Sequence, residues 1–286
     1  MRRRLQEALV FETPGWEELL RLGLPMLAAV VSAAACDVLA NRRERPPGFR
    51  VGWRRAAAAA LLAGVFYVGV FAPLGAVGLD LELDLSGTRP WELFTLHGLL
   101  AGVMLVWGLL AYARDRDRAD SLGRRLARAF RLASPRPLGE IGLGLWAGVA
   151  IWGGVLLLLI ALAAAVLALG GQGILPEGPP GVVGFLVAQP VWLRVAMALS
   201  AGVVEEAFFR GFLQPRIGLV FSTALFALAH WSYGEPFLLV GVTLLSLVYG
   251  LLARRRGDVW AAMTAHAVFD AIQLLVVIPW VVSQFT

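Results

Sequence analysis

The chain has a single cysteine, Cys36, among its 286 residues. One cysteine forbids an internal disulfide framework, and this one has no neighbouring partners for a metal site. The chain also lacks lysine, so all 25 basic residues are arginine, and only 16% of its residues are charged. Hydrophobic residues make up 59%, against roughly 45–50% in ordinary soluble domains. A water-soluble globule of this size cannot bury so much apolar surface, which excludes that class.

Long apolar runs predict an all-α, polytopic membrane helix bundle, because about 20 residues of helix cross a hydrocarbon core of about 30 Å. We expect about eight transmembrane segments, which lie at about Gly23–Ala40, Ala56–Leu79, Trp91–Ala113, Leu143–Leu169, Pro190–Leu213, Ile217–Trp231, Phe237–Ala253 and Val259–Val282. Residues 1–142 are predicted to form an N-terminal membrane region with surface helices and arginine-rich cytoplasmic loops. Membrane helices, including a functional core at about 190–282, follow over residues 143–286.

Four arginine clusters alternate with acidic or neutral loops, at residues 42–55, 114–136, 216 and 254–256. The positive-inside rule makes these clusters cytoplasmic and places the C-terminus outside. Arginines both precede and follow the first segment, so a tilted, a re-entrant and a true spanning helix all stay open there. In the second cluster, Leu122, Leu126 and Phe130 recur every four residues, which predicts a basic surface helix. We expect anionic lipid headgroups, and no nucleic acid, as its partner.

Three full charges interrupt the fifth span, in the stretch AGVVEEAFFRGFLQP. A charge at a helix centre costs roughly 2.5–3.5 kcal/mol, so these side chains cannot face lipid unpaired. Glu206 and Arg210 lie four residues apart, which predicts an ion pair on one helix face. Glu205 points about 100° away and has no basic residue four positions on. It must therefore be neutral, paired with another helix, or exposed to a water-filled cavity.

Two histidines and an aspartate follow on the next helices. His230 ends the sixth span, and His266 lies four residues before Asp270 on the last one. So many ionisable groups within membrane helices are hard to explain by packing, and we expect them to converge with Glu205 in a functional site. His97, alone near the start of the third span, is interpreted instead as an interfacial or packing residue.

Three motifs on successive membrane helices carry a family resemblance: Glu205-Glu206-x-x-x-Arg210, Phe226-x-x-x-His230 and His266-x-x-x-Asp270. In this order they resemble the CAAX-protease and bacteriocin-processing family of intramembrane endopeptidases. The resemblance covers about residues 190–282 and implies proteolysis within or beside the membrane. Asp270 departs from the pattern, because archaeal and eukaryotic CAAX proteases have asparagine there. An ionised carboxylate cannot donate a hydrogen bond to an oxyanion, so Asp270 can take that role only when it is protonated.

The chemistry expected from these groups is hydrolysis by an activated water. No Ser-His-Asp signature is convincing, and Cys36 lies far in sequence from the candidate histidines, so a covalent nucleophile is not indicated. Glu205 would serve as general base and pass the proton to the leaving amine. His230 would help to hold the water, and His266 would stabilise the tetrahedral oxyanion.

The remaining roles are supporting ones. Asp270 would orient His266 and favour its protonated form, while Glu206 and Arg210 would brace the helix. A zinc site is the alternative, with His230, His266 and a carboxylate from Glu205 or Asp270 as ligands and an open position for water. The sequence has no HExxH helix and the ligands would come from distant segments, so we favour the mechanism without a cofactor.

A non-hydrolytic membrane protein for binding, immunity or transport is the second function class, with the buried charges lining a polar cavity or a proton relay. Transporters often show polar breaks in two repeated halves. Here the charges lie almost wholly in one half, which favours an enzyme acting on a membrane-associated protein or peptide. Prenylated C-termini, bacteriocin leaders and membrane sorting tags stay open as substrates. The composition suggests a GC-rich bacterial genome, and thus a bacterial inner membrane, which makes a prenylated substrate less favoured.

Overall fold

The structure is a computed structural model, and it describes residues 16–75, 89–113, 120–171, 181–231 and 236–284. Every regular element in these ranges is a helix. Six helices in the described part of the chain are long and apolar enough to cross a membrane. The predicted all-α, polytopic membrane bundle is therefore confirmed. Most of the predicted outer loops, at residues 76–88, 172–180 and 232–235, lie outside the described residues.

The number of ordinary apolar spans in the described chain differs from the eight expected. The six are Gly23–Arg43, Gly52–Leu74, Glu92–Tyr112, Pro137–Ala168, Leu238–Arg256 and Trp260–Val282. The remaining two predicted spans are helical as well. One of them, from Val191 to Ile217, contains Glu205, Glu206 and Arg210 within two turns, and the other, Leu219–Ala229, has only 11 residues. The charged residues of the first helix and the short length of the second distinguish these two helices from the six apolar spans.

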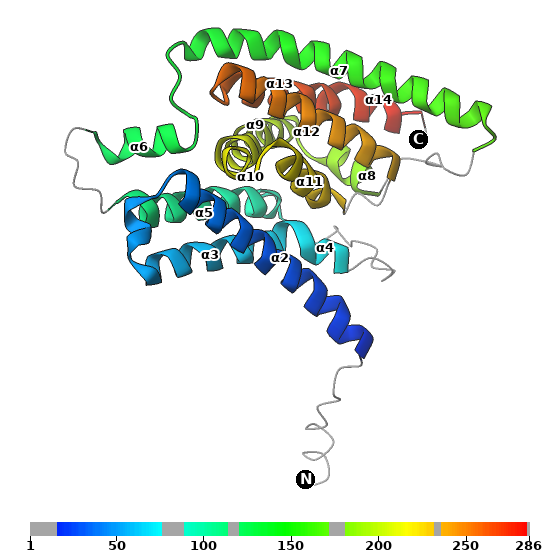
Figure 1. Cartoon of the computed structure of the whole chain (residues 1–286). Coiled ribbons are helices and arrows are strands. Elements are labelled where there is room, and N and C mark those ends of the chain that lie inside the picture. Colours follow the sequence, from blue (N-terminus) through cyan, green and yellow to red (C-terminus); the bar gives the residue numbers. More distant parts are fainter. Residues whose placement is uncertain (1–15, 76–88, 114–119, 172–180, 232–235, 285–286) are drawn as a thin grey trace, which may run out of the picture.

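The N-terminal layer holds the first three spans (Figure 1). It consists of α2 (Trp16–Arg43), η1 (Pro47–Arg50), α3 (Gly52–Phe66), η2 (Tyr67–Phe71), α4 (Ala72–Gly75), η3 (Glu92–Phe94) and α5 (Thr95–Tyr112). Helix α3 packs against both α2 and α5. Because α2 is one continuous helix of 28 residues, the re-entrant alternative for the first segment is removed.

The rest of the described chain forms the other side of the bundle and a short connecting helix. It consists of α6 (Leu122–Ala129), α7 (Pro137–Ala168), α8 (Gly181–Ala188), α9 (Val191–Glu206), η5 (Ala207–Leu213), α10 (Gln214–Ile217), α11 (Leu219–Ala229), α12 (Pro236–Arg256), α13 (Trp260–Ile272), η7 (Gln273–Val277) and α14 (Ile278–Val282). Helix α13 packs between α7 and α9, and α11 packs on α12. The order of contacts thus places α9 and η5 between α13 and the N-terminal layer.

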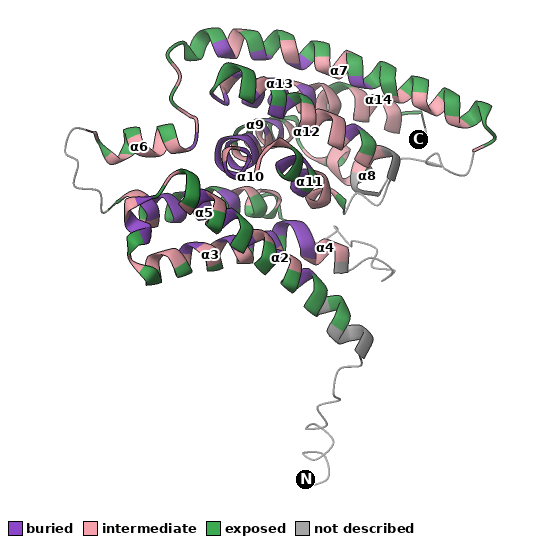
Figure 2. Cartoon of the chain, in the orientation of Figure 1, coloured by how far each residue is buried: buried purple, intermediate pink, exposed green. Residues whose placement is uncertain are grey.

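Helix α7 lies on the outside of the bundle and exposes much of its surface (Figure 2). It approaches α13 through two glycines four residues apart, Gly144 and Gly148, where an added Cβ would lie 2.7 Å from the carbonyl oxygen of Ala261 and 2.8 Å from that of Ala265. Small residues at this spacing allow membrane helices to pack closely. The predicted boundary at residue 142/143 falls inside α7, and the division of the chain there stays a prediction.

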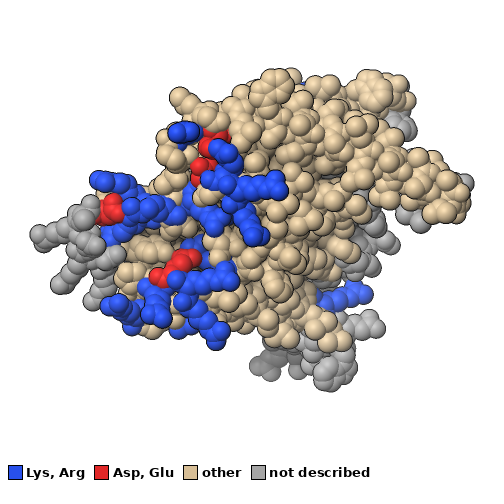
Figure 3. Space-filling model, turned by 45° about the horizontal axis from the view of Figure 1, so that its top comes forward, with Lys and Arg blue, Asp and Glu red and all other residues tan. Residues whose placement is uncertain are grey.

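Most of the arginines visible in Figure 3 gather at one end of the molecule. Contacts join the arginine-rich turns to one another: Arg43 donates to the carbonyl oxygen of Pro215 at 2.8 Å, and Arg256 pairs with Glu140 at 2.6 Å. The gathering agrees with a single cytoplasmic face. The predicted basic helix is present as α6, with the Ser121 side chain capping its N-terminus.

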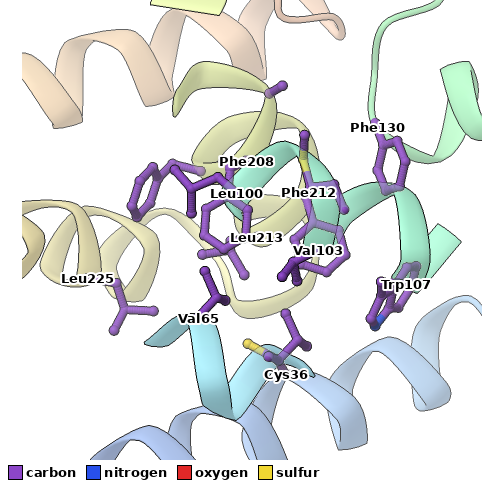
Figure 4. Packing of buried hydrophobic residues seen from close by; sticks show 14 of the residues in the cluster. Cys36, Val65, Leu100, Val103, Trp107, Phe130, Phe208, Phe212, Leu213 and Leu225 are labelled. Atoms are coloured by element: carbon purple, nitrogen blue, oxygen red, sulfur yellow. The ribbon is translucent and has the colours of Figure 1, made fainter. Parts of the chain in front are cut away.

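Buried aromatic side chains join the N-terminal layer to η5 (Figure 4). Phe208 lies 6.4 Å from Phe66, and Phe212 lies 4.9 Å from Trp107, measured between ring centroids. All four side chains are at most 1% exposed. Because their edge-to-face packing fixes the rings relative to one another, the charged residues next to η5 are held against α3 and α5.

Candidate active site

Helix α9 ends in the two glutamates and continues without a break into π-helical η5. Single-turn π-helices inside α-helices occur frequently at functional sites. Glu205 and Glu206 face different neighbours, as expected from the angle of about 100° between consecutive helical residues. They therefore head two separate polar clusters.

Glu206 joins α9 to α13. Its Oε2 lies 3.1 Å from Nε of Arg210, and its Oε1 lies 2.9 Å from Nδ1 of His266. Nε2 of His266 lies 3.4 Å from Oδ2 of Asp270. The predicted pairs of Glu206 with Arg210 and of His266 with Asp270 are confirmed, and Glu206 connects them. An imidazole that faces two carboxylates can donate to both only when both of its nitrogens carry protons.

Phe226 lies at the centre of the site and explains the first position of its motif. Its ring is 4.3 Å from the guanidinium carbon of Arg210, a cation–π contact. His230 stacks on the same ring at 4.4 Å, and His266 approaches it at 6.1 Å. The side chain of Arg210 is 1% exposed, so its charge is balanced by Glu206 and this ring without contact to lipid.

Glu205 heads the second cluster, between two imidazoles from other helices. Its Oε1 lies 3.2 Å from Nε2 of His97, and its Oε2 lies 3.8 Å from Nε2 of His230. Oε2 is buried and has no hydrogen-bond partner among the described residues. Nδ1 of His230 lies 2.8 Å from the carbonyl oxygen of Phe226. Since a carbonyl only accepts, Nδ1 carries a proton, and in a neutral imidazole Nε2 is then the acceptor on the side of Glu205.

The interpretation of His97 as an interfacial or packing residue is wrong. Helix α5 packs against α9 and brings His97 to a carboxylate 108 residues away in the sequence. Its imidazole is 14% exposed. The location of His97 within a membrane helix was the sequence signal for such a contact, because an ionisable side chain there requires a polar partner. Sequence spacing could not identify which helix supplies that partner.

A cavity of about 180 Å³ lies beside Glu205 and His230. Its other walls come from both the N-terminal layer and the core: Val65, Gly69, Val70, Leu96, Leu100, Phe208, Phe209 and Ala229. The two polar groups are thus on the wall of an otherwise apolar space. A carboxylate oxygen and an imidazole lone pair in this arrangement can hold and polarise a water molecule.

The alternative zinc ligands do not fit a metal site in this structure. Among the described residues, no three histidine, cysteine, aspartate or glutamate side chains come together in a way that could hold a metal ion. Both ring nitrogens of His266 face carboxylates in the cluster of Glu206, whereas His230 faces Glu205. The expected ligands are therefore divided between two clusters.

The fold and these clusters define an integral membrane protein with carboxylate–histidine pairs buried in its interior. Residues 187–272 match the family model described as "Type II CAAX prenyl endopeptidase Rce1-like", which confirms the family resemblance over that segment. A relative is the uncharacterized protein YpbD of Bacillus subtilis (strain 168), 37% identical over 79 residues, or 27% of this chain and 42% of the relative. The match thus spans less than half of that curated relative. No solved structure matches the chain.

Proposed function

We propose that the protein is an intramembrane endopeptidase that cleaves a membrane-associated protein or peptide with a glutamate-activated water. The observation that carries the proposal is the buried Oε2 of Glu205, which faces Nε2 of His230 at 3.8 Å on the wall of the cavity. Both residues belong to the segment that matches the Rce1-like family. We place the protein in a bacterial inner membrane, with its arginine-rich face toward the cytoplasm.

The reaction requires one water and no covalent enzyme intermediate. Oε2 of Glu205 takes a proton from the water while the water oxygen forms a bond to the carbonyl carbon of the scissile peptide. His230 Nε2 accepts the second hydrogen of that water and orients it. The proton on Glu205 then passes to the peptide nitrogen as the carbon–nitrogen bond breaks, which releases an amine and a carboxylic acid.

The cluster of Glu206 supplies the electrostatic support. His266, protonated between Glu206 and Asp270, places a positive charge close to the reaction. Stabilising the negative charge that develops on the carbonyl oxygen is the largest contribution in many acyl transfers. Arg210 balances Glu206, which leaves Asp270 as the carboxylate that balances the imidazolium.

The apolar walls of the cavity favour an apolar side chain next to the scissile bond. Leu96, Leu100, Phe208 and Phe209 surround the space in front of Glu205. Burial of a leucine- or phenylalanine-sized side chain there contributes about 1.5–3 kcal/mol. A peptide with small polar residues at that position would lose this contribution and bind more weakly.

The first prediction is that Glu205→Gln abolishes cleavage and leaves the protein folded. The amide keeps the shape of the side chain and its contact with His97, but it cannot take a proton from water. The measurement compares new protein termini in membranes from cells that produce the parent or the Glu205→Gln protein. A synthetic peptide that spans a mapped cleavage site is then assayed with both purified proteins in phospholipid vesicles.

Glu92→Gln is the matched control, because Glu92 is an exposed glutamate on η3. It should cleave like the parent. Wild-type turnover by a folded Glu205→Gln protein would remove the general-base assignment. Identical termini in all membranes, together with binding of peptides by the purified parent, would favour the non-hydrolytic class.

A further inference from the structure

One of the two imidazoles next to Glu205 comes from outside the segment that matches the Rce1-like family. His97 lies on α5 in the N-terminal layer, whereas the match begins at residue 187. The N-terminal layer therefore contributes more than apolar packing to the site.

Hydrogen bonding determines the orientation of the imidazole. Nε2 of His97 lies 3.2 Å from Oε1 of Glu205, and Nδ1 lies 2.8 Å from Oγ of Ser200. An ionised carboxylate only accepts, so Nε2 carries the proton that it donates to Glu205. When the ring is neutral, Nδ1 is an acceptor, and the hydroxyl of Ser200 can donate to it. Ser200 thus fixes the tautomer that Glu205 requires.

The two oxygens of Glu205 therefore have different surroundings. His97 holds Oε1, while Oε2 has no hydrogen-bond partner among the described residues and lies opposite His230. We infer that His97, fixed by Ser200, is a positioning residue that directs the free oxygen of Glu205 toward the cavity. The inference rests on the proposed function, because it assigns His97 a role only if Glu205 acts as the base.

The same three side chains do not form a serine nucleophile with its base. Glu205 and His230 line the cavity, whereas Ser200 and His97 do not. The carbonyl carbon of a substrate in the cavity would lie near Glu205, with the imidazole of His97 between that carbon and the hydroxyl of Ser200. The hydroxyl therefore acts on the ring behind the base and not on the substrate.

Two amide substitutions at His97 separate positioning from packing. Glutamine places its amide nitrogen near the position of Nε2 and keeps the donor to Glu205, whereas asparagine is one methylene shorter and loses it. With a synthetic peptide spanning a mapped cleavage site, we expect His97→Asn to lower kcat about 100-fold with KM unchanged. His97→Gln should keep most of the parent kcat. Thermal unfolding of both variants in detergent shows that the difference is not one of folding.

The kinetic outcomes distinguish this inference from the proposed function. If Glu205→Gln is inactive but both His97 variants turn over like the parent, the positioning role is overturned and the general base stands. If Glu205→Gln turns over like the parent, the positioning role and the general-base assignment are both overturned. Ser200→Ala should cost less than His97→Asn, and a loss as complete as that of Glu205→Gln would overturn the inference in favour of a serine nucleophile.

A second measurement needs no substrate. The chain has only three histidines, so a sample labelled with nitrogen-15 histidine gives three pairs of imidazole nitrogen signals, and the His97→Gln sample identifies the pair of His97. We expect Nε2 of His97 to be protonated and Nδ1 to be an acceptor whose chemical shift moves in Ser200→Ala. His230 should show the opposite tautomer. A proton on Nδ1 of His97, with Nε2 bare beside Glu205, would overturn the inference.

Discussion

Glu205 and Glu206 are the same residue type in adjacent positions, and their surroundings separate their roles. Glu205 has one oxygen bound to His97 and one oxygen toward the cavity. Glu206 is 0% exposed, and both of its oxygens lie next to positively charged or hydrogen-bonding groups. A general base needs access to a water molecule, and only Glu205 has it.

We predict that Glu206→Gln acts mainly on stability. The glutamine amide has a single acceptor oxygen, so it cannot accept from both Arg210 and His266, and Arg210 stays buried without a charged partner. Breaking a buried pair in this way costs about 3–5 kcal/mol, so the midpoint of thermal unfolding should fall well below that of the parent and of Glu92→Gln. A Glu206→Gln protein that melts like the parent but does not cleave would instead assign both glutamates to the chemistry.

We predict that Asp270→Asn keeps substantial activity. Its amide can still contact Nε2 of His266, which lies 3.4 Å from Oδ2 of Asp270, and the substitution restores the residue of the archaeal and eukaryotic relatives. The amide also adds a donor that a carboxylate lacks. Asp270→Ala removes the contact with His266 and provides no donor, so it serves as the comparison. The asparagine variant should be about as active as the parent, and the alanine variant should be less active than either. If both variants are inactive, residue 270 does not act through the contact and the donor that asparagine provides.

The same position tests the metal alternative. If Asp270 held zinc, or oriented a zinc-bound His266, its loss would weaken metal affinity or activity by about 10–100-fold. We expect chelator-treated parent protein to cleave the mapped peptide and elemental analysis to find less than one zinc per chain. Stoichiometric zinc, with activity lost on chelation and restored by zinc, would recast His230, His266 and a carboxylate as ligands.

The packing of α9 on α13 determines whether the Glu206 cluster forms. Gly202, one turn before Glu206, is a point of close approach, where an added Cβ would lie 2.6 Å from the carbonyl oxygen of Met263 and 2.8 Å from Cβ of Ala267. Backbone atoms cannot give way as a flexible side chain can. The glycine therefore sets the distance between the carboxylate on one helix and His266 on the other.

We predict that Gly202→Ala destabilises the protein by about 1–3 kcal/mol, the usual cost of overpacking. Helix α13 must move away from α9, which lengthens the bond between Glu206 and His266, and kcat should fall further than the melting midpoint alone explains. Gly153→Ala on α7 is the matched control, because nothing lies within 4 Å of its added Cβ. Equal stability and activity of the two variants would contradict close packing at Gly202.

The molecule as a whole presents most of the arginines visible in Figure 3 at one end. This asymmetry predicts that Ala133, in the turn before α7, faces the cytoplasm, while Ser283, after α14, faces the opposite side. Both are exposed. Ala133→Cys and Ser283→Cys should therefore react with a membrane-impermeant thiol reagent from opposite sides. Cys36 is 1% exposed and supplies a nearly silent background, and labelling of both cysteines from one side would contradict the orientation.

The sequence by itself determined that the protein folds in a lipid bilayer, and it determined which residues of the site pair within one helix. Apolar run length depends on composition alone, so the membrane bundle followed from it. The pairs of Glu206 with Arg210 and of His266 with Asp270 lie four residues apart on single helices, and helical geometry places such residues on one face whatever surrounds them. The order of the three motifs indicated the family before any contact between helices was known.

Contacts between helices were decided only by the tertiary structure. His97 reaches Glu205 because α5 packs on α9, and Glu206 joins His266 because Gly202 lets α9 approach α13. Apolar helices offer several faces of similar hydrophobicity to their neighbours, and in lipid the choice among them depends on the fit of small side chains and on polar partners. Periodicity within one helix does not show which neighbour each face contacts, so the sequence alone could not reveal that His97 bonds to Glu205.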